Sequence, residues 1–204
     1  MKKILWLCLI SWLCAACATP QSELANYLHN FNSMQANFTQ VISDSNHKII
    51  YKSAGQMALS RPGKFRWQTI SPSDQLILAN QKTIWIYDAD LAQATKQTQT
   101  NEDSHSPAML LTQNNQNLLT NFIITQQGSN FYLMPKNSTH AYFKKIQLTF
   151  NHEQLTAMQI LDKLDQTTLI QFSHIQINPE LSKQVFLFNP PPNVEIIDNT
   201  HANS

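Results

Sequence analysis

Short stretches of alternating apolar and polar residues recur along most of this chain, and residues that favour turns separate them. In residues 64–70, Phe65 and Trp67 fall on one face, while charged and amide side chains fall on the other. Successive side chains of a strand point to opposite faces, so this segment is predicted to be a half-buried β-strand. Pro62 and Gly63 precede it, one fixing φ and the other permitting a positive φ, which is typical of a turn.

The predicted strands follow one another at close spacing, which favours a meander of consecutive antiparallel strands. Regular structure is expected to end at the proline run 190–192, and the polar tail after about residue 198 is expected to be disordered. The predicted strands are residues 34–39, 48–59, 64–70, 75–79, 83–88, 92–97, 123–127, 131–134, 143–150, 155–161, 167–177 and 185–188.

Apolar segments with helical periodicity interrupt the strands. The first, residues 22–31, has Ser22 as its candidate N-cap, and core packing is the simplest explanation of its apolar stripe. A second starts at Ser106 and Pro107, and a third short helix is plausible around residues 116–122. Such a chain is predicted to form a curved sheet with one open face, as in a partly closed barrel plugged by helices. The first stripe comprises Leu24, Tyr27, Leu28 and Phe31, and the second helix continues with Met109, Leu110 and Leu111.

The N-terminus has the pattern of a secretory signal peptide, residues 1–18. Basic residues precede an apolar stretch, residues 4–13, that is too short for a stable transmembrane helix. Ala16-Cys17-Ala18 fits a small-x-small cleavage site that would leave Thr19 as the first residue of one domain, 19–204. The alternative is a lipoprotein box at residues 13–17, in which Cys17 is acylated and stays at the membrane.

Cysteine content and charge exclude several classes of protein. Cys8, Cys14 and Cys17 all lie in the leader, so the mature domain is predicted to have neither a disulfide nor thiol chemistry. The formal charge is +1, and loss of Lys2 and Lys3 leaves 12 basic against 13 acidic residues, or −1. A near-neutral domain with dispersed lysines and arginines is a poor candidate for nucleic-acid binding.

No catalytic motif emerges from the polar residues. The 7 histidines are dispersed, and the 3 glycines form neither a phosphate-binding loop nor a nucleophile elbow. Asp88-Ala89-Asp90 is the one pair of carboxylates that favours an enzymatic hypothesis, a divalent cation held against a sugar phosphate. Because such turns are common as plain backbone caps, the turn interpretation is preferred, and no metal, cofactor or catalytic residue is assigned.

Several short motifs, in order over nearly the whole mature chain, resemble the LolA family, the periplasmic outer-membrane lipoprotein carrier proteins of Gram-negative bacteria. One departure lies at residues 192–195, where the family usually has a Gly and an Asp; Asn193 can adopt the same left-handed conformation. The matching motifs are Phe38-Thr39-Gln40, residues 55–60 leading into 61–67, Trp85-Ile86-Tyr87-Asp88, residues 90–93, residues 107–111 and residues 186–191.

The resemblance implies an incomplete antiparallel barrel, mainly β, whose short helices form a lid over an apolar cavity. It implies that Arg61 fastens the lid through backbone carbonyls at the helix ends. The residue pattern alone would equally allow a surface charge at a strand edge. Phe65 is expected to border the cavity; periodicity leaves open which other aromatics face it. The full expectation is Phe65, Trp67, Trp85 and Tyr87 for the cavity, and Leu24, Leu28, Phe31, Met109, Leu110 and Leu111 for the lid.

The implied function is that of a monomeric periplasmic chaperone without covalent chemistry or cofactor. It would take triacylated lipoproteins from an ATP-driven releasing transporter of the inner membrane and deliver them to a receptor in the outer membrane. One alternative is the membrane-anchored receptor of the same fold, with an acylated Cys17. The other is a periplasmic sugar-acting enzyme that uses Asp88 and Asp90.

Overall fold

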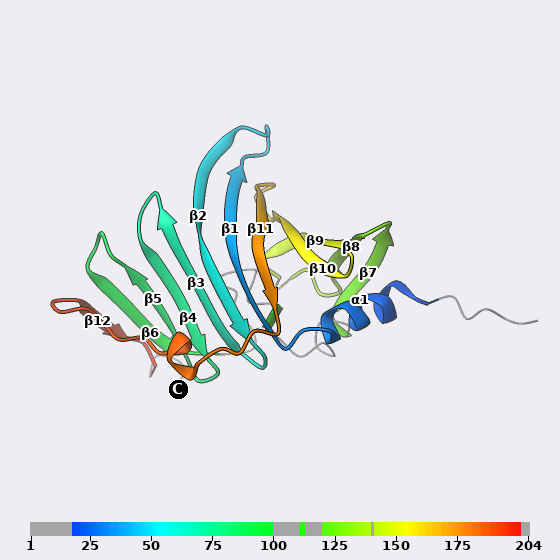
Figure 1. Cartoon of the computed structure of the whole chain (residues 1–204). Helices are drawn as coiled ribbons and strands as arrows, with labels where there is room; N and C mark the ends of the chain where they lie inside the picture. The colour runs from blue at the N-terminus through cyan, green and yellow to red at the C-terminus, as the bar shows by residue number, and fades with distance from the viewer. Residues whose placement is uncertain (1–17, 100–110, 113–119, 140, 201–204) are drawn as a thin grey trace, which may run out of the picture.

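The chain folds around one open, twisted β-sheet, shown in Figure 1. The computed structural model describes residues 18–99, 111–112, 120–139 and 141–200. Within these residues the sheet has 12 strands in the order β12-β6-β5-β4-β3-β2-β1-β11-β10-β9-β8-β7. The edge strands β12 and β7 do not pair with each other, so the sheet does not close. The prediction of a mainly β, unclosed antiparallel sheet is therefore confirmed.

Strands β1 to β6 form one half of the sheet and β7 to β11 the other, and the halves join through β1 and β11. Neighbours within each half are consecutive antiparallel strands, which confirms the predicted meander. The first half comprises β1 (Ser33–Ser43), β2 (Ile49–Ser60), β3 (Lys64–Ser71), β4 (Gln75–Asn80), β5 (Thr83–Asp88) and β6 (Gln93–Thr98). The second comprises β7 (Phe122–Gln127), β8 (Asn130–Pro135), β9 (Phe143–Asn151), β10 (Gln154–Asp162) and β11 (Thr167–Ile177).

Helix α1 (Pro20–His29) precedes the sheet and lies beside its β7 side, as Figure 1 shows. The predicted cap at Ser22 is wrong, because the helix begins earlier and Thr19 Oγ1 accepts the backbone N–H of Ser22 at 3.2 Å. The predicted apolar stripe is confirmed, since Leu24 and Leu28 are both buried. No helix among the described residues combines the length and apolar character that a membrane crossing needs.

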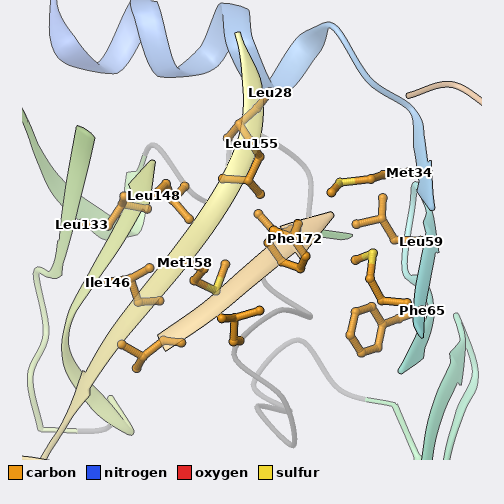
Figure 2. Close-up of a cluster of buried hydrophobic side chains, with 14 of the residues drawn as sticks. Leu28, Met34, Leu59, Phe65, Leu133, Ile146, Leu148, Leu155, Met158 and Phe172 are labelled. Atoms are coloured by element: carbon orange, nitrogen blue, oxygen red, sulfur yellow. The ribbon is translucent and has the colours of Figure 1, made fainter. Parts of the chain in front are cut away.

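The register of the strands gives the sheet two chemically different faces. Leu59 pairs with Phe65, Phe65 with Ala79, and Ala79 with Ile84, so these side chains share one face, here called the inner face. The hydrophobic core lies on this face and extends across both halves of the sheet. Figure 2 shows part of it beneath α1, including Leu28, Met34, Leu59, Phe65, Leu133, Ile146, Leu148, Leu155, Met158 and Phe172.

The C-terminal segment departs from the predicted order of elements. The closing strand predicted at residues 185–188 is wrong: Val185 and Phe186 end a 3₁₀ turn, η2 (Lys183–Phe186), that Ser182 caps, and residues 187 and 188 form no regular structure. After the proline run, Asn193 has φ 64°, which confirms its predicted left-handed conformation. The chain then adds β12 (Glu195–Asp198), which pairs in parallel with β6 although regular structure was expected to end at residues 190–192.

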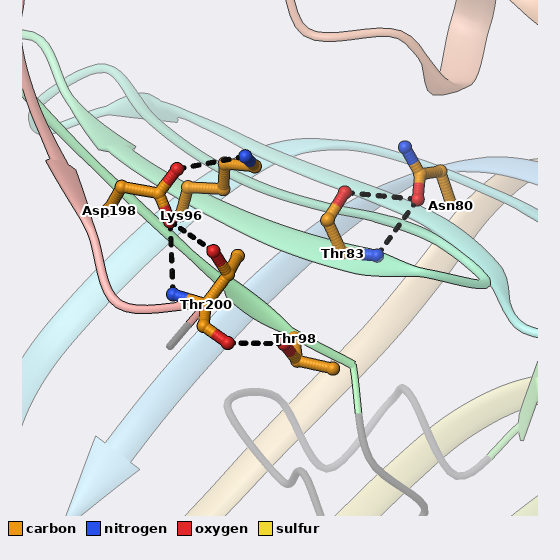
Figure 3. Close-up of polar contacts among 6 residues, drawn as sticks. All are labelled: Asn80, Thr83, Lys96, Thr98, Asp198 and Thr200. Atoms are coloured by element: carbon orange, nitrogen blue, oxygen red, sulfur yellow. Dashed lines mark hydrogen bonds and ion pairs between the residues drawn. The ribbon is translucent and has the colours of Figure 1, made fainter. Parts of the chain in front are cut away.

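Side-chain contacts hold β12 at the edge of the sheet, as Figure 3 shows. Asp198 accepts from Lys96 Nζ at 2.9 Å and from the hydroxyl of Thr200 at 2.6 Å. Thr98 Oγ1 donates to the carbonyl of Thr200 at 3.2 Å. These polar contacts hold residues 198 and 200 against β6, and the rest of the predicted tail, residues 201–204, lies outside the described residues.

Of the remaining predicted elements, several fall outside the described residues. These are residues 1–17, the predicted second helix up to Leu110, and residues 113–119. Of the third helix, predicted around residues 116–122, residues 120 and 121 are helical, and residue 122 is the first residue of β7.

Candidate functional site

The turn between β2 and β3 places Arg61 against the segment that links α1 to the sheet. Its guanidinium donates from Nη1 to the carbonyl of Leu28, in the last turn of α1, and to the carbonyl of Phe31 at 3.1 Å. Its Nε donates to the carbonyl of Leu111 at 2.8 Å. One side chain therefore joins two segments that lie far apart in the sequence, both expected in the lid.

The backbone of the same turn makes further contacts with both segments. The N–H of Arg61 donates to the carbonyl of Asn32 at 2.8 Å, and the N–H of Gly63 donates to the carbonyl of Thr112 at 3.2 Å. Gly63 has φ +67°, the positive value predicted for this turn, which a residue with a Cβ adopts only with strain. The turn thus presents a donor from its backbone to each of the segments that Arg61 contacts.

Arg61 remains a cation although its surroundings are largely apolar. Burial lowers its pKa to about 10, which still leaves it charged at pH 7. Its Cζ lies 4.3 Å from the centroid of the Phe31 ring, a cation–π distance. Among the described residues, Nη2 has no hydrogen-bond partner. The contacts at Arg61 are those expected of a latch, while its effect on cargo stays a prediction.

Aromatic side chains of neighbouring strands line the inner face beyond the latch. Phe38 stacks on Trp67 with ring centroids 3.7 Å apart, and Phe65 lies 6.0 Å from Trp67. Beyond Trp67 the inner face opens into a cavity of about 320 Å³, also lined by Ile77, Ile86 and Tyr51. This volume lies at the lower end of the range for drug-sized ligands, so several acyl chains would require the covering segments to move.

Of the aromatics expected in the cavity, Trp85 lies elsewhere, whereas Tyr87 also borders the cavity of about 320 Å³. Trp85 and Tyr87 point to the outer face and pack on Phe188, with centroid distances of 4.9 and 5.6 Å. Tyr87 borders a larger cleft there, of about 680 Å³, with Gln56 and Arg66. Charged and amide side chains line this cleft, and Gln40, Gln75 and Asp88 line part of the smaller cavity as well, so hydrocarbon would pack only on the apolar parts of either.

The lid residues that the structure describes are all buried. Leu24, Leu28, Phe31 and Leu111 each expose 2% or less of their surface. Leu28 and Phe31 also supply the carbonyls that Arg61 binds, so burial and latch contacts coincide in one segment. Met109 and Leu110 lie outside the described residues.

Polar contacts that no sequence motif indicated tie α1 to the other half of the sheet. Gln126 on β7 donates to Glu23 at 2.8 Å, and Asn30 donates to Glu153 at 2.9 Å. Glu23 also accepts from the hydroxyl of Tyr27 at 3.2 Å, and burial, followed by this hydrogen bond, raises the pKa of that phenol. Amide–carboxylate pairs carry no spacing signal, because their partners lie about a hundred residues apart in the chain.

The acidic turn after β5 serves as a backbone cap. One carboxylate oxygen of Asp88 accepts the N–H of Asp90 at 3.0 Å and that of Leu91 at 3.2 Å. This confirms the turn interpretation of Asp88-Ala89-Asp90. In the described part of the chain, no three His, Cys, Asp or Glu side chains come together as metal ligands.

Comparison with known proteins bears on this arrangement of lid, arginine and apolar face. A family profile described as "Outer membrane lipoprotein carrier protein LolA" matches residues 29–189. The chain belongs to the LolA family. An outer-membrane lipoprotein carrier protein of Coxiella burnetii is 36% identical over 192 residues, covering 92% of this chain and 91% of its own. One from Legionella pneumophila is 33% identical over 182 residues, covering 88% and 90%.

Solved structures with this fold include a LolA superfamily protein of Nitrosomonas europaea. It aligns with a TM-score of 0.51 at 13% identity, covering 84% of this chain and 98% of its own. At that identity the likeness establishes the fold alone. Together with the sequence relatives, it supports the assignment of the LolA fold to this chain.

Proposed function

We propose that this LolA-family chain is a periplasmic chaperone that binds the acyl chains of lipoproteins and delivers them to the outer membrane. The observation that carries the proposal is the apolar inner face held under α1 and Leu111 by one buried arginine. An apolar surface covered by a separable helix suits a carrier whose cargo enters and leaves. The names of the sequence relatives support the same role.

Acyl-chain energetics explain why such a carrier needs a movable lid. Each buried methylene contributes about 0.8 kcal/mol, so one full chain gains on the order of 10 kcal/mol. Water alone would not release such a ligand. When the cavity is empty, α1 buries Leu24 and Leu28 against the inner face, and cargo must displace that contact. When the cargo leaves, this contact forms again, and its free energy offsets part of what is lost with the acyl-chain contacts.

In this proposal the chain does no covalent chemistry and uses no cofactor. Energy for loading comes from an ATP-driven releasing transporter of the inner membrane, and a receptor in the outer membrane accepts the cargo. The signal segment predicted at residues 1–18 supports a periplasmic location, and the dispersed, near-neutral charge disfavours nucleic-acid partners. Arg61 sets the balance between the closed and open lid.

A release assay from spheroplasts tests the proposal. The purified mature chain is added to spheroplasts that display labelled triacylated lipoproteins, and the supernatant is fractionated by size. We expect the lipoprotein to co-elute with the chain as a one-to-one complex. Lipoproteins that stay entirely with the membranes would contradict the proposal.

Mass spectrometry of the mature N-terminus separates the carrier from the membrane-anchored receptor. The carrier predicts that cleavage leaves Thr19 first. A diacylglyceryl group on Cys17 would instead identify the receptor, for which the lipoprotein box in the leader is the favouring observation.

A further inference from the structure

The cavity of about 320 Å³ on the inner face contains two buried hydroxyl groups that no described residue binds. Ser53 and Thr69 expose 8% and 7% of their surface, and both line this cavity. Neither side chain has a hydrogen-bond partner among the described residues. Since a buried hydroxyl normally has a protein or water partner, these two are available to a ligand that offers acceptors.

The period of two places both hydroxyls on the inner face. Thr69 follows Phe65 and Trp67 at alternate positions of β3, and Ser53 precedes Leu59 by six residues on β2. Phe65, Trp67 and Leu59 belong to the hydrophobic core. The two hydroxyls therefore continue the apolar rows of the inner face at the end away from the latch.

Further polar side chains lie beside these hydroxyls. Register pairs Gln40 with Ser53, Thr69 with Gln75, and Gln75 in turn with Asp88. All five residues line the same cavity, on either side of the register shift between β2 and β3, and are called the polar row. Gln75 donates to Asp88 at 2.8 Å, whereas the amide of Gln40 has no partner among the described residues.

Apolar side chains flank the polar row, so a ligand of this cavity must combine acceptors with hydrocarbon. Trp67, Ile77 and Ile86 lie on the latch side of the row, and Ile42 lies on the other. Among the described residues that line the cavity, Asp88 alone is charged, which disfavours a free fatty acid or a phosphate beside it. Uncharged acceptors attached directly to acyl chains are the carbonyls of carboxylic esters.

We propose that the polar row binds the ester carbonyls of a diacylglyceryl group. Ser53 and Thr69 donate their hydroxyl protons to the two carbonyl oxygens, and the acyl chains run from there along the inner face toward the latch. The six residues from Ser53 to Leu59 cover about 20 Å of strand. A chain in one leaflet of a bilayer spans about 15 Å, half of the hydrocarbon core, so it fits within this length. The assignment rests on the proposed function, because the acyl chains enter only when the covering segments move.

Competition between ester-linked and ether-linked lipids tests the polar row. A triacylated lipopeptide and its analogue with two ether-linked chains differ only in the two ester carbonyls. Equal amounts are offered to the chain that starts at Thr19, and mass spectrometry quantifies the lipid that co-purifies with it. We expect the ester form to be enriched about tenfold, because the ether form cannot accept the two hydrogen bonds.

Variants of the two hydroxyl residues assign the preference to the polar row. Ser53→Ala and Thr69→Val each remove one hydroxyl with little change of shape, so each should lower the enrichment about threefold. The double variant should bind both lipids equally. Thr39→Val is the control, because Thr39 is exposed on the outer face of β1, and it should keep the full enrichment. Equal losses in Thr39→Val and Thr69→Val would contradict the assignment.

The wild-type comparison needs no variant to fold, and it separates the polar row from the carrier function. Equal binding of the ester and ether lipopeptides refutes the polar row alone. A chain that binds neither lipopeptide refutes the carrier function and the polar row with it.

The same competition with phospholipids identifies the source of the ester. Diacylphosphatidylglycerol and its diether analogue replace the lipopeptides. An ester preference in both pairs supports a site that also accepts membrane phospholipid, and a preference limited to the lipopeptides supports a site for lipoproteins.

Discussion

Arg61 concentrates three carbonyl contacts in one side chain, and its loss should affect cargo exchange more than folding. In Arg61→Leu, the carbonyls of Leu28, Phe31 and Leu111 lose their donor, so the closed lid is less stable. We expect normal loading with lipoprotein but slow transfer to outer membranes, because the closed state no longer competes with cargo. Pulse-chase experiments measure the rate of loading and, starting from purified complexes, the rate of transfer to outer membranes.

Arg61→Lys is the matched control for charge. Lysine keeps the cation but lacks the planar fork that reaches several carbonyls, so transfer should also be impaired. Transfer at the wild-type rate in both variants would show that the contacts of Arg61 do not control cargo transfer.

Gly55 tests how closely two strands and an aromatic ring pack on the inner face. A Cβ at Gly55 would lie 1.9 Å from the carbonyl oxygen of Gln68 and 2.9 Å from Phe38 Cζ. Gly55→Ala should therefore destabilise the fold by about 3 kcal/mol or more, as overpacking does. Urea unfolding measures the change.

Gly128→Ala is the comparison for this prediction. Nothing lies within 4 Å of its added Cβ, but its φ is +58°, so only backbone strain of about 1 kcal/mol is expected. Similar losses at the two glycines would contradict the close packing at Gly55.

Helix α1 should open independently of the sheet, since only its apolar stripe and a few polar contacts hold it. Leu28→Ala removes a fully buried side chain and should cost about 2–5 kcal/mol of the lid's local stability. Hydrogen exchange followed by mass spectrometry should then show faster exchange in Pro20–His29 than in the sheet. Asn26→Ala, on the exposed side of α1, is the control and should leave exchange unchanged.

The edge strand β12 should loosen in acid. Hydrogen bonds from Thr200 and then from Lys96 hold the pKa of Asp198 well below its usual range. A carboxylate whose pKa is lowered on folding stabilises the fold above its unfolded pKa, and that contribution disappears as pH falls toward the folded value. Amide NMR shifts of Ile196 and Ile197 should therefore change below about pH 4.

Asp198→Asn should abolish this pH response and leave β12 loosened at neutral pH. Asp165→Asn, which breaks the ion pair with Lys144, should not alter the β12 signals. An unchanged titration in Asp198→Asn would show that another group controls β12.

The sequence predicted elements best where apolar and polar residues alternate strictly. Met34, Ala36 and Phe38 lie on the inner face as the period of two requires, and their strand was predicted correctly. Strand β5 was ambiguous because Ile84 and Ile86 are as apolar as Trp85 and Tyr87. Periodicity could not assign its faces, and burial of Ile84 decided them.

Other elements depended on contacts that periodicity does not encode. Strand β12 is short and follows prolines, and its parallel pairing with β6 depends on Asp198, Lys96 and Thr200. The apolar run at residues 185–188 suggested a strand, yet Ser182 caps a turn that takes up its first two residues. The role expected for Arg61 came from family resemblance, because its three acceptors are backbone carbonyls of segments distant in sequence.

At the scale of the molecule, cargo exchange should require α1 to separate from the second half of the sheet. All three cysteines lie within residues 1–18, so introduced pairs in a chain that starts at Thr19 have no competing thiols. Asn30→Cys with Glu153→Cys, joined by a short bis-maleimide, should block lipoprotein loading. The spheroplast assay measures it before and after the reaction.

A tether within the sheet is the control for the cross-link. Lys144→Cys with Asp165→Cys replaces an ion pair of 2.5 Å and spans strands that need not separate. Loading by the chain cross-linked between Asn30→Cys and Glu153→Cys would contradict the requirement for helix movement.

The joining of the two halves of the sheet through β1 and β11 alone has a mechanical consequence. The α1 segment is bound to one half of the sheet through Arg61 and to the other through Gln126 and Glu153, so it limits how far the two halves can move apart. Once these contacts are broken, the two halves of the sheet can move apart about β1 and β11. The volume enclosed between the two halves would then adapt to the number and length of the acyl chains that it holds.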